Sequence, residues 1–518
     1  MTEAHDAAGS RLDTLTSWHA DWKDLRVAVL GLSMTGFSAA DTLVELGADV
    51  LVVTEAAAEE YERLLPVIGA RLWKGALDAA PQELVDFAPD VVVASPGFPP
   101  SHAVVRWTRE SGIALWGDIE LAWRVRDKVV RPDGTPAAWV LVTGTNGKTT
   151  TTRLAATMLA EGGLRAAPCG NIGVPVLDAV RDPAGFDVLV VELSSHQLFY
   201  LGLADGEGPG AVSPHAAVCL NLADDHLEWH GSAAAYRDAK AVVYRNTRAA
   251  CVYNKADEAT RRMVEDADVV EGARAIGFDL GVPGPSDFGV VDGILVDRAF
   301  LDDRRTSALE LATVDELAAA GLAAPHIVAN ILAAAALARS LDVAPAAVRS
   351  AIAGFRLDPH RIEVVAASGG VTWVDDSKAT NPHAAASSLA AYPGAVWVVG
   401  GLLKGVDISD LVAARGAGVR AAIVIGVERA EVVDAFARHA PAVPVFEVDH
   451  ADTEDVMARV VELAASVALA GDTVLLAPAA ASFDQFRSYG DRGDRFAAAV
   501  RERFGEDDDA DDDASLGH

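Results

Sequence analysis

The sequence has little cysteine, and this limits the compartments it fits. Only three of its 518 residues are cysteines, Cys169, Cys219 and Cys251. Their odd number and irregular spacing match neither a disulfide framework nor a paired metal-ligand motif, which excludes a small disulfide-stabilised secreted scaffold. We expect three buried thiols in a reducing compartment, so the sequence predicts a cytoplasmic protein.

Positive charge and long apolar runs are also scarce. The 43 lysines and arginines face 75 acidic residues, giving a net charge of −32, which disfavours nucleic acid and anionic lipid as partners. Apolar runs such as residues 331–338 fall short of the ~18–20 residues needed to cross a bilayer. Asp6 and Asp13, with no apolar run between them, argue against a signal peptide.

What the sequence does have is enough apolar material for several cores. Hydrophobic residues make up 51% of the chain, and at ~100–200 residues per domain the length predicts about three domains. From residue 26 onward short β-branched runs alternate with longer helical patterns, which is typical of βαβ units and parallel sheets. We therefore predict three consecutive α/β domains: a Rossmann-like N-terminal domain, a central P-loop ATPase domain and a Rossmann-like C-terminal domain.

Composition changes set the expected boundaries. A Pro- and Gly-rich stretch at 131–136 separates the first two domains, and βα alternation resumes near residue 355. A dense acidic run near the C-terminus and a polar N-terminus predict loose ends, and residues 204–210 predict a surface insertion. The predicted division is 1–20 as a loose extension, 21–134, 135–355 and 356–505 as domains, and 506–518 as a disordered acidic tail.

The strongest local motif lies between a predicted strand at 138–142 and a helical run at 154–159. Residues 143–150 read Thr-Gly-Thr-Asn-Gly-Lys-Thr-Thr. In a P-loop, glycines let backbone N–H groups surround a phosphate, the lysine neutralises its charge and the following hydroxyl ligates Mg²⁺. Val142 stands where the usual template has its first glycine, so a plain glycine turn remains an alternative. We predict ATP or GTP binding.

A weaker pattern follows the first strand. Gly31, Ser33 and Gly36 approximate a dinucleotide fingerprint, with Glu55 at a suitable distance downstream. Ser33 replaces the middle glycine and would crowd a pyrophosphate, which disfavours NAD and FAD. The pattern is equally compatible with another nucleotide or with simple packing of a helix on a strand.

Several motifs together resemble those of a known family. Besides the P-loop they are Gly-Asn-Ile-Gly at 170–173, Glu-Leu-Ser-Ser at 192–195, Asn-Leu-Ala-Asp-Asp-His at 221–226, Tyr-Arg-Asp-Ala-Lys at 236–240 and Asp-Ser-Lys-Ala-Thr-Asn at 376–381. This ordered set, spanning about residues 25–503, resembles the Mur ligases, the ATP-dependent amino-acid ligases of peptidoglycan synthesis. The stretch 482–493 resembles the members of that family that add D-glutamate.

The resemblance implies a reaction. Such ligases transfer the γ-phosphoryl group of ATP to a substrate carboxylate, and the amine of the incoming amino acid attacks the resulting acyl phosphate. By resemblance the chain would add D-glutamate to UDP-N-acetylmuramoyl-L-alanine, act as a monomer in the cytoplasm and use two Mg²⁺ ions. Both steps bring anions together, so cations must neutralise them.

The resemblance also assigns the ATP and metal sites, although each residue has a plainer reading by itself. Glu192 could be a solvated strand end, His226 a structural histidine, Lys240 a solvated cation, and Arg361 with Asp376 a buried ion pair. By resemblance the catalytic residues are Lys148, Glu192, His226 and Lys240, and the metal ligands are Thr149, Glu192, His226 and Lys240 as a carbamate. The implied ATP-binding residues are Gly144, Thr145, Asn146, Gly147, Lys148, Thr149, Thr150, Asn330, Arg361 and Asp376.

Two further sets are implied for the other substrates. The UDP-sugar would be held by Met34, Thr35, Thr54, Glu55, Gly97 and Asn171. D-glutamate, a dianion, would be held by Lys378, Thr380, Lys404, Ser482, Phe483 and Tyr489. Viewed singly, Lys404 could be a solvated loop residue, and Phe483 and Tyr489 could be core aromatics.

Two alternative functions remain open from the sequence. One is a ligase of the same family with another substrate, adding L-alanine, diaminopimelate or D-Ala-D-Ala, or an enzyme similar to folylpolyglutamate synthase. The other is a nucleotide-dependent switch that keeps the P-loop without ligase chemistry. The residues at 376–380 and 482–493 disfavour the first, and the acid, histidine and lysine at the implied metal positions disfavour the second.

Overall fold

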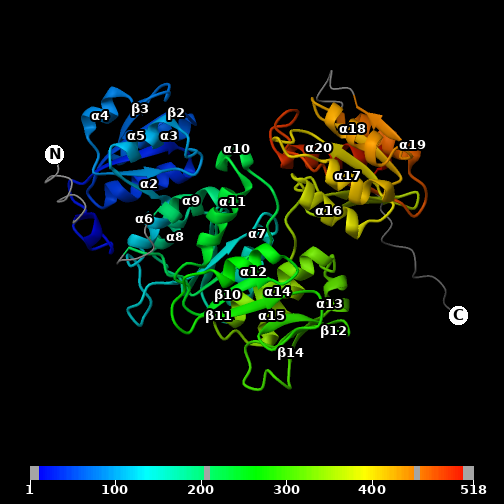
Figure 1. The fold of residues 1–518 in the computed structure, drawn as a ribbon, viewed down its shortest axis with the longest axis horizontal. Coiled ribbons are helices and arrows are strands. Elements are labelled where there is room, and N and C mark those ends of the chain that lie inside the picture. Colours follow the sequence, from blue (N-terminus) through cyan, green and yellow to red (C-terminus); the bar gives the residue numbers. More distant parts are fainter. Residues whose placement is uncertain (1–10, 204–209, 449–455, 506–518) are drawn as a thin grey trace. The chain divides into compact units, whose positions relative to one another are not determined.

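A computed structural model describes residues 11–203, 210–448 and 456–505. Within these ranges the strands form three sheets that follow one another along the chain (Figure 1). The predicted fold class, three consecutive α/β domains, is confirmed. The predicted insertion at 204–210, except for its last residue, and the acidic tail at 506–518 lie outside the described residues, as do residues 1–10.

The first sheet is entirely parallel, with strand order β3-β2-β1-β4-β5. Its central strands are apolar and buried, so helices must cover both faces. The strands are β1 (Arg26–Leu32), β2 (Asp49–Ala57), β3 (Arg71–Lys74), β4 (Val91–Ala94) and β5 (Ala114–Gly117). The helices are α2 (Met34–Glu45), α3 (Glu59–Ile68), α4 (Gln82–Phe87), α5 (Ala103–Glu110) and α6 (Asp118–Arg124).

The second sheet, in the order β14-β13-β12-β11-β10-β9-β6-β8-β7, is parallel except where β13 pairs with β12 and β14. Its strands are β6 (Ala138–Thr143), β7 (Ala166–Gly170), β8 (Val188–Glu192), β9 (Ala216–Cys219), β10 (Ala250–Asn254), β11 (Arg274–Phe278), β12 (Asp287–Val291), β13 (Ile294–Asp297) and β14 (Leu309–Thr313). Its helices are α7 (Lys148–Glu161), α8 (Val176–Arg181), α9 (Ser195–Leu203), α10 (Leu227–His230), α11 (Ala233–Ala241), the 3₁₀ turn η1 (Val242–Tyr244), α12 (Glu258–Glu265), α13 (Val314–Ala319), α14 (Pro325–Arg339) and α15 (Pro345–Gly354).

The third sheet, in the order β15-β16-β20-β17-β18-β19, is parallel apart from its antiparallel edge strand β15. Its strands are β15 (Glu363–Ser368), β16 (Val371–Asp375), β17 (Val396–Gly400), β18 (Ala421–Ile425), β19 (Val445–Glu447) and β20 (Thr473–Leu476). Its helices are α16 (Pro382–Ala391), α17 (Ser409–Arg415), the 3₁₀ turn η2 (Gly416–Gly418), α18 (Ala430–His439), α19 (Val456–Val467) and α20 (Tyr489–Phe504).

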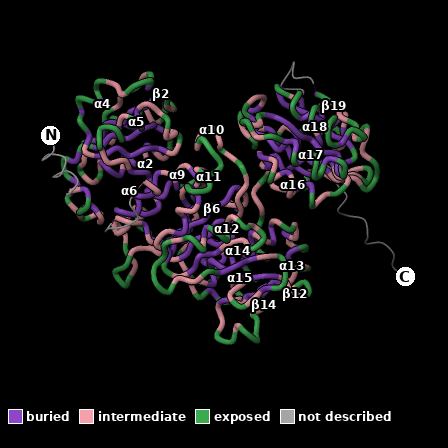
Figure 2. The backbone as a smooth tube through the Cα atoms, in the orientation of Figure 1, coloured by how far each residue is buried: buried purple, intermediate pink, exposed green. Residues whose placement is uncertain are grey.

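The three sheets belong to two compact units. Unit 1 holds the first two sheets and consists of residues up to 222 and 229–355, while unit 2 consists of 223–228 and residues from 356. The segment 223–228 therefore packs with the third sheet, although the sequence places it inside a central domain of 135–355. The buried strands of each sheet are purple in Figure 2, with exposed residues mainly in the connections.

Residues 11–20, which the sequence predicts to be part of a loose end, pack against unit 1 instead. Leu12 and Leu15 are buried in the same core as the first sheet. The Arg124 guanidinium donates hydrogen bonds to the carbonyl oxygens of both leucines, at 3.1 and 3.0 Å. The two buried leucines, and the Trp18 backbone N–H that donates to Asp127 at 2.6 Å, hold this segment against unit 1.

The three cysteines are all buried, as predicted. Burial raises the pKa of the Cys169 thiol to about 12, and that of Cys219 and Cys251 to about 11. A thiol must lose its proton to become a nucleophile, so these side chains act as small apolar groups. In the part of the chain that the structure describes, no helix is both long and apolar enough to span a bilayer.

Candidate active site

The predicted P-loop forms a tight turn between β6 and α7. Gly144 and Gly147 adopt left-handed backbone conformations, with φ of +149° and +84°, and α7 begins at Lys148. The Lys148 ammonium lies back over the turn and donates to the carbonyl oxygens of Gly144 and Thr145, both at 2.9 Å. A helix N-terminus and a lysine ammonium thus converge on one turn, which suits a phosphate group.

Two asparagines hold this turn in shape. The Asn221 side chain accepts from the Asn146 backbone N–H at 2.9 Å and donates to the Asn146 carbonyl oxygen at 3.1 Å. Asn330, implied as an ATP contact, lies directly against Gly147, where an added Cβ would come within 2.5 Å of its Oδ1 atom. The sequence reasoning assigned no role to Asn221, although it directly follows a buried strand in one of the family motifs.

Helix α11 brings a second lysine to the same turn. Lys240 is 1% exposed, and its ammonium donates to the Gly144 carbonyl oxygen at 2.8 Å and to the Thr143 hydroxyl at 3.3 Å. Tyr236 lies beside it, with its ring 5.0 Å from the ammonium and its hydroxyl 2.9 Å from that of Thr145. Lys148 and Lys240 therefore share one carbonyl oxygen, which concentrates positive charge at the loop.

Glu192 is the last residue of β8. It pairs with Val142 of β6, the strand that leads into the P-loop turn, so its side chain lies near that turn. Its side chain is 2% exposed, and Asn171 donates to its Oε1 atom at 3.0 Å. Its Oε2 atom is buried and has no hydrogen-bond partner. An unpaired carboxylate oxygen in such a position is costly unless a cation meets it, so the residues present fit a Mg²⁺ ion here.

His226 lies in a different compact unit from Thr149, Glu192 and Lys240. It belongs to the segment 223–228 of unit 2 and adopts a left-handed conformation with φ of +52°. Its Nε2 atom is 3.8 Å from an Asp225 carboxylate oxygen. The structure thus brings together three of the four implied metal residues in unit 1 and places the fourth in unit 2.

The residues implied for the UDP-sugar lie mostly at the carboxyl edge of the first sheet. Met34 and Thr35 begin α2, Thr54 and Glu55 lie in the last part of β2, and Gly97 follows β4. Asn171 belongs to the second sheet and contacts Glu192, as described above. Of this set, the Thr54 hydroxyl donates to the Ala56 carbonyl oxygen at 2.7 Å, and Glu55 accepts from the Leu77 backbone at 3.0 Å.

The near-fingerprint around Ser33 has a packing explanation. A Cβ on Gly36 would lie 2.0 Å from the Gly31 carbonyl oxygen, and one on Gly31 would lie 3.0 Å from the Phe98 ring. Gly31 also has a left-handed φ of +91°. Close approach of α2 to β1 accounts for Gly36, and the left-handed backbone with the nearby Phe98 ring accounts for Gly31, without a dinucleotide.

The residues implied for D-glutamate gather at the carboxyl ends of three neighbouring strands in unit 2. Lys378 and Thr380 follow β16, Lys404 follows β17, and Ser482, Phe483 and Tyr489 follow β20. The Lys378 ammonium lies 3.7 Å from the centre of the Tyr489 ring. A backbone bridge between Leu402 and Ala481 joins the second and third of these loops. Ser482 is 2% exposed, whereas Phe483 is 68% exposed.

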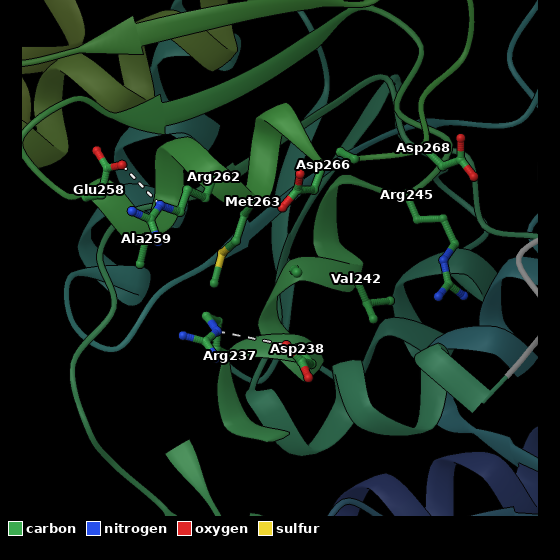
Figure 3. Close-up of a pocket in the computed structure, with 12 residues that line it drawn as sticks. Arg237, Asp238, Val242, Arg245, Glu258, Ala259, Arg262, Met263, Asp266 and Asp268 are labelled. Carbon is green, nitrogen blue, oxygen red and sulfur yellow. Dashed lines mark hydrogen bonds and ion pairs between the residues drawn. The ribbon is translucent and has the colours of Figure 1, made fainter. Parts of the chain in front are cut away.

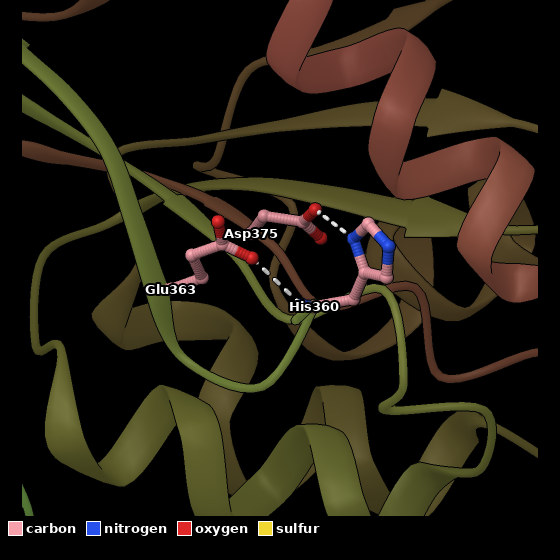
Figure 4. A group of neighbouring side chains, drawn as sticks. All are labelled: His360, Glu363 and Asp375. Carbon is pink, nitrogen blue, oxygen red and sulfur yellow. Dashed lines mark hydrogen bonds and ion pairs between the residues drawn. The ribbon is translucent and has the colours of Figure 1, made fainter. Parts of the chain in front are cut away.

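A partly buried network that the sequence did not predict supports this edge of the sheet. His360 Nδ1 lies 2.7 Å from an Asp375 carboxylate oxygen, and the His360 backbone N–H donates to Glu363 at 2.8 Å (Figure 4). The His360 carbonyl oxygen accepts from the Lys378 backbone N–H at 3.2 Å. The buried Arg492 guanidinium donates to Ser377 at two points, both at 2.9 Å. These contacts fix the loop that carries Lys378.

Arg361 and Asp376 do not form a direct ion pair with each other, which was the structural alternative to a role in ATP binding. The Arg361 guanidinium lies 3.6 Å from Asp358. Asp376 is 8% exposed and accepts from the Ser388 hydroxyl and, at 3.3 Å, from the Ile362 backbone. Burial raises the pKa of the Asp376 carboxyl to about 7, although the Ser388 hydrogen bond and the Arg361 charge oppose the shift.

Replacing Asp376 by asparagine should therefore stabilise the protein at high pH only. The folded state favours the protonated carboxyl, so its contribution to stability is present below about pH 4 and is lost as the pH rises to about 7. We expect the free energy of unfolding to rise by about 2 kcal/mol at pH 8 and to change little near pH 4. Urea unfolding at both pH values measures this. Asp434→Asn, at an exposed carboxylate of the same unit, is the control, and an equal gain at both pH values would contradict the explanation.

A cavity of about 850 Å³ lies beside α11, away from the P-loop turn. It is bordered by Arg237 of α11, Met263 of α12 and Arg245, which follows η1 (Figure 3). Acidic side chains such as Glu258 also line it, and Arg262 pairs with Glu258 at 3.1 Å. Lys240 and Tyr236 are not among the described residues that line it, so this cavity is separate from the loop site.

A mostly parallel sheet with a P-loop turn, a buried acid and two lysines near its carboxyl edge is typical of nucleotide-dependent phosphoryl-transfer enzymes. The comparisons give the family: residues 142–338 match the Mur ligase middle domain, and residues 360–480 match the Mur ligase glutamate ligase domain. The chain belongs to the Mur ligase family.

Curated relatives match nearly the whole chain. A protein of Leifsonia xyli subsp. xyli named UDP-N-acetylmuramoylalanine--D-glutamate ligase is 62% identical over 96% of this chain and 96% of its own length. A Streptomyces avermitilis protein of the same name is 49% identical over 93% of this chain and 99% of its own length. Among solved structures, UDP-N-acetylmuramate-alanine ligase of Thermotoga maritima covers 92% of this chain and 100% of its own, with a TM-score of 0.53 and 18% identity, which supports the fold alone.

Proposed function

We propose that the chain is an ATP-dependent ligase that adds D-glutamate to UDP-N-acetylmuramoyl-L-alanine, in cytoplasmic synthesis of peptidoglycan precursors. The observation that carries the proposal is the phosphate turn with Lys148, Lys240 and the buried Glu192 around it. The names of the relatives, at up to 62% identity over nearly the whole chain, support the choice of substrates.

In this proposal ATP lies on the P-loop turn of unit 1. The backbone of residues 144–150 and the Lys148 ammonium neutralise the phosphates, and Asn330 contacts the nucleotide beside Gly147. Arg361 and Asp376 are proposed as further ATP-binding residues. Phosphoryl transfer to the terminal carboxylate of the UDP-sugar substrate gives an acyl phosphate, whose carbonyl carbon the amine of D-glutamate then attacks with loss of phosphate.

Two Mg²⁺ ions would be held by Thr149, Glu192, His226 and Lys240, the last as a carbamate. When bound, such ions supply positive charge that offsets the negative charge on the phosphates and on the reacting carboxylate. The unpartnered Oε2 atom of Glu192 supports one of these positions. Carbamylation would convert the buried Lys240 from a cation that repels a metal ion into an anion that binds it.

The other substrates would occupy the edges of the first and third sheets. Met34, Thr35, Thr54, Glu55, Gly97 and Asn171 would hold the UDP-sugar. Lys378, Thr380, Lys404, Ser482, Phe483 and Tyr489 would hold D-glutamate, whose two carboxylates need the two lysines. We further propose a monomer with domains at 21–134, 135–355 and 356–505.

A phosphate-release assay with ATP and UDP-N-acetylmuramoyl-L-alanine tests the proposal. We expect turnover with D-glutamate to exceed that with L-alanine or glycine by at least about a hundredfold, because a site that pairs both carboxylates rejects ligands lacking one. L-Glutamate and diaminopimelate carry two carboxylates, but in an arrangement that cannot pair both while the amine reaches the acyl phosphate, so we expect them to react at least about a hundredfold more slowly as well. Omitting the UDP-sugar is the control and should abolish phosphate release. Turnover with another amino acid but not D-glutamate would overturn the substrate assignment, and ATP binding without turnover would favour a nucleotide switch.

A further inference from the structure

We propose that Asp118 is a positioning residue that fixes the direction of the Glu192 carboxylate through Gln197 and Ser194. The proposal rests on the ligase function and the magnesium site proposed above, and adds a residue to them. Asp118 begins α6, directly after β5 of the first sheet, whereas Glu192 ends β8 of the second sheet. Helices α6 and α9, both in unit 1, pack against each other (Figure 1).

One short hydrogen bond joins Asp118 to helix α9. Gln197 Nε2 donates to Asp118 Oδ2 at 2.8 Å. Asp118 is 4% exposed and Gln197 is 2% exposed, so water does not compete for this contact. Burial raises the pKa of Asp118 to about 6, and at pH 7.5 the side chain is therefore mainly a carboxylate, which only accepts hydrogen bonds.

The orientation of the Gln197 amide follows from its other partner. The Ser194 backbone N–H, which can only donate, bonds to Gln197 Oε1 at 3.0 Å. The amide nitrogen must then point the other way, toward Asp118. The Ser194 hydroxyl in turn accepts from the Gln197 backbone N–H at 3.1 Å. Asp118 thus orients an amide that is bonded at its far end to the turn between β8 and α9.

Glu192, the last residue of β8, lies two residues before Ser194, where this turn begins. Among the residues that the structure describes, the Glu192 side chain has one hydrogen-bond partner, Asn171 on Oε1, and Oε2 is buried without a hydrogen bond. The direction of Oε2 therefore depends on the backbone of the turn, which the contact chain from Asp118 holds. Replacing a residue that orients a metal ligand, without itself touching the metal, commonly weakens metal binding by about 10–100-fold.

The positioning role predicts weaker metal binding when the Asp118 carboxylate, the acceptor for the Gln197 amide, is removed. Mn²⁺ serves as the probe, and its dissociation constant in the presence of ADP is measured by electron paramagnetic resonance. We expect Asp118→Ala to raise that constant about tenfold, and to raise the half-saturating Mg²⁺ concentration in the phosphate-release assay by a similar factor. Ser38→Ala is the matched control, because the Ser38 hydroxyl donates to Asp178 at 2.6 Å across the same two sheets without reaching Glu192.

An exchange of the two partners separates positioning from folding. In the double variant Asp118→Asn with Gln197→Glu, the new amide donates to the new carboxylate, whose other oxygen still accepts from Ser194. We expect it to restore Mn²⁺ binding to within about twofold of the unaltered protein, whereas Gln197→Glu alone sets two carboxylates face to face and should bind no better than Asp118→Ala. This comparison decides the matter even if Asp118→Ala folds poorly.

Two results would overturn the positioning role: unchanged Mn²⁺ binding in folded Asp118→Ala, or no recovery in the folded exchange variant. Mn²⁺ binding is measured without any amino acid. These outcomes are therefore distinct from a result that rejects D-glutamate as the substrate. If the unaltered chain binds Mn²⁺ but turns over an amino acid other than D-glutamate, the substrate assignment fails and the positioning result stands.

Discussion

Replacing Lys148 by methionine should lower kcat by at least about a thousandfold. Methionine keeps most of the length of the side chain and removes the charge that the structure holds over the phosphate turn, 2.9 Å from the carbonyl oxygens of Gly144 and Thr145. Without this ammonium, the negative charge that moves onto the phosphates during transfer has no lysine to neutralise it. Steady-state phosphate release gives kcat, and calorimetric titration with ADP shows whether the nucleotide still binds.

Lys255 offers the matched control for that variant. It is a partly exposed lysine of the same compact unit, paired with Asp287 at 2.6 Å. Lys255→Met should leave kcat within about twofold, because a surface ion pair contributes about 0–1 kcal/mol to stability and lies outside the site. A Lys148→Met variant that retained more than a tenth of the activity would exclude the proposed role of the loop.

Replacing Lys240 by alanine should lower kcat by about a hundredfold or more, and a short carboxylate such as acetate or formate should restore part of it. The structure buries this lysine against the phosphate turn, where it stands 2.8 Å from the Gly144 carbonyl oxygen. A carbamate at Lys240 would place an anion beside the metal, and a small free carboxylate can fill the space that alanine leaves. Activity is measured against carboxylate concentration.

Two controls make the Lys240 test specific. Lys240→Arg keeps the charge but cannot form a carbamate, so it should be as inactive as the alanine variant and should not respond to carboxylates. Lys148→Met should also show no rescue, since it lacks a cation and not an anion. Full activity in Lys240→Arg, or an alanine variant that no short carboxylate restores, would count against the carbamate.

Local signals in the sequence predicted most of the fold. The central strands β1, β6, β8, β17 and β18 are short buried runs of β-branched residues, and pattern alone finds such strands. Edge strands are harder: β7 contains Pro168, which suits a sheet edge but reads as a break. Strands β12 and β14 were not predicted because Gly289 and Glu310 interrupt their apolar runs.

The same distinction applies to the site. Lys148 and Thr149 were predicted from a motif that is complete within eight residues. Asn221, Tyr236 and His360 gain their roles only through contacts with residues far away in the chain, such as the 75 residues that separate Asn221 from Asn146. No spacing in one sequence carries that information. The assignments that rest on resemblance for D-glutamate and the UDP-sugar stay predictions until ligands are bound.

The burial of all three cysteines makes the protein well suited to site-specific labelling. With the thiol pKa of Cys169 raised to about 12 and those of Cys219 and Cys251 to about 11, a maleimide dye at neutral pH would find almost no native thiolate. Cysteines introduced at Val67 in unit 1 and Leu469 in unit 2, which are 79% and 58% exposed, would then carry a donor and an acceptor without background. Energy transfer between them could follow the separation of the two units through a catalytic cycle, in a chain that needs no prior removal of its own cysteines.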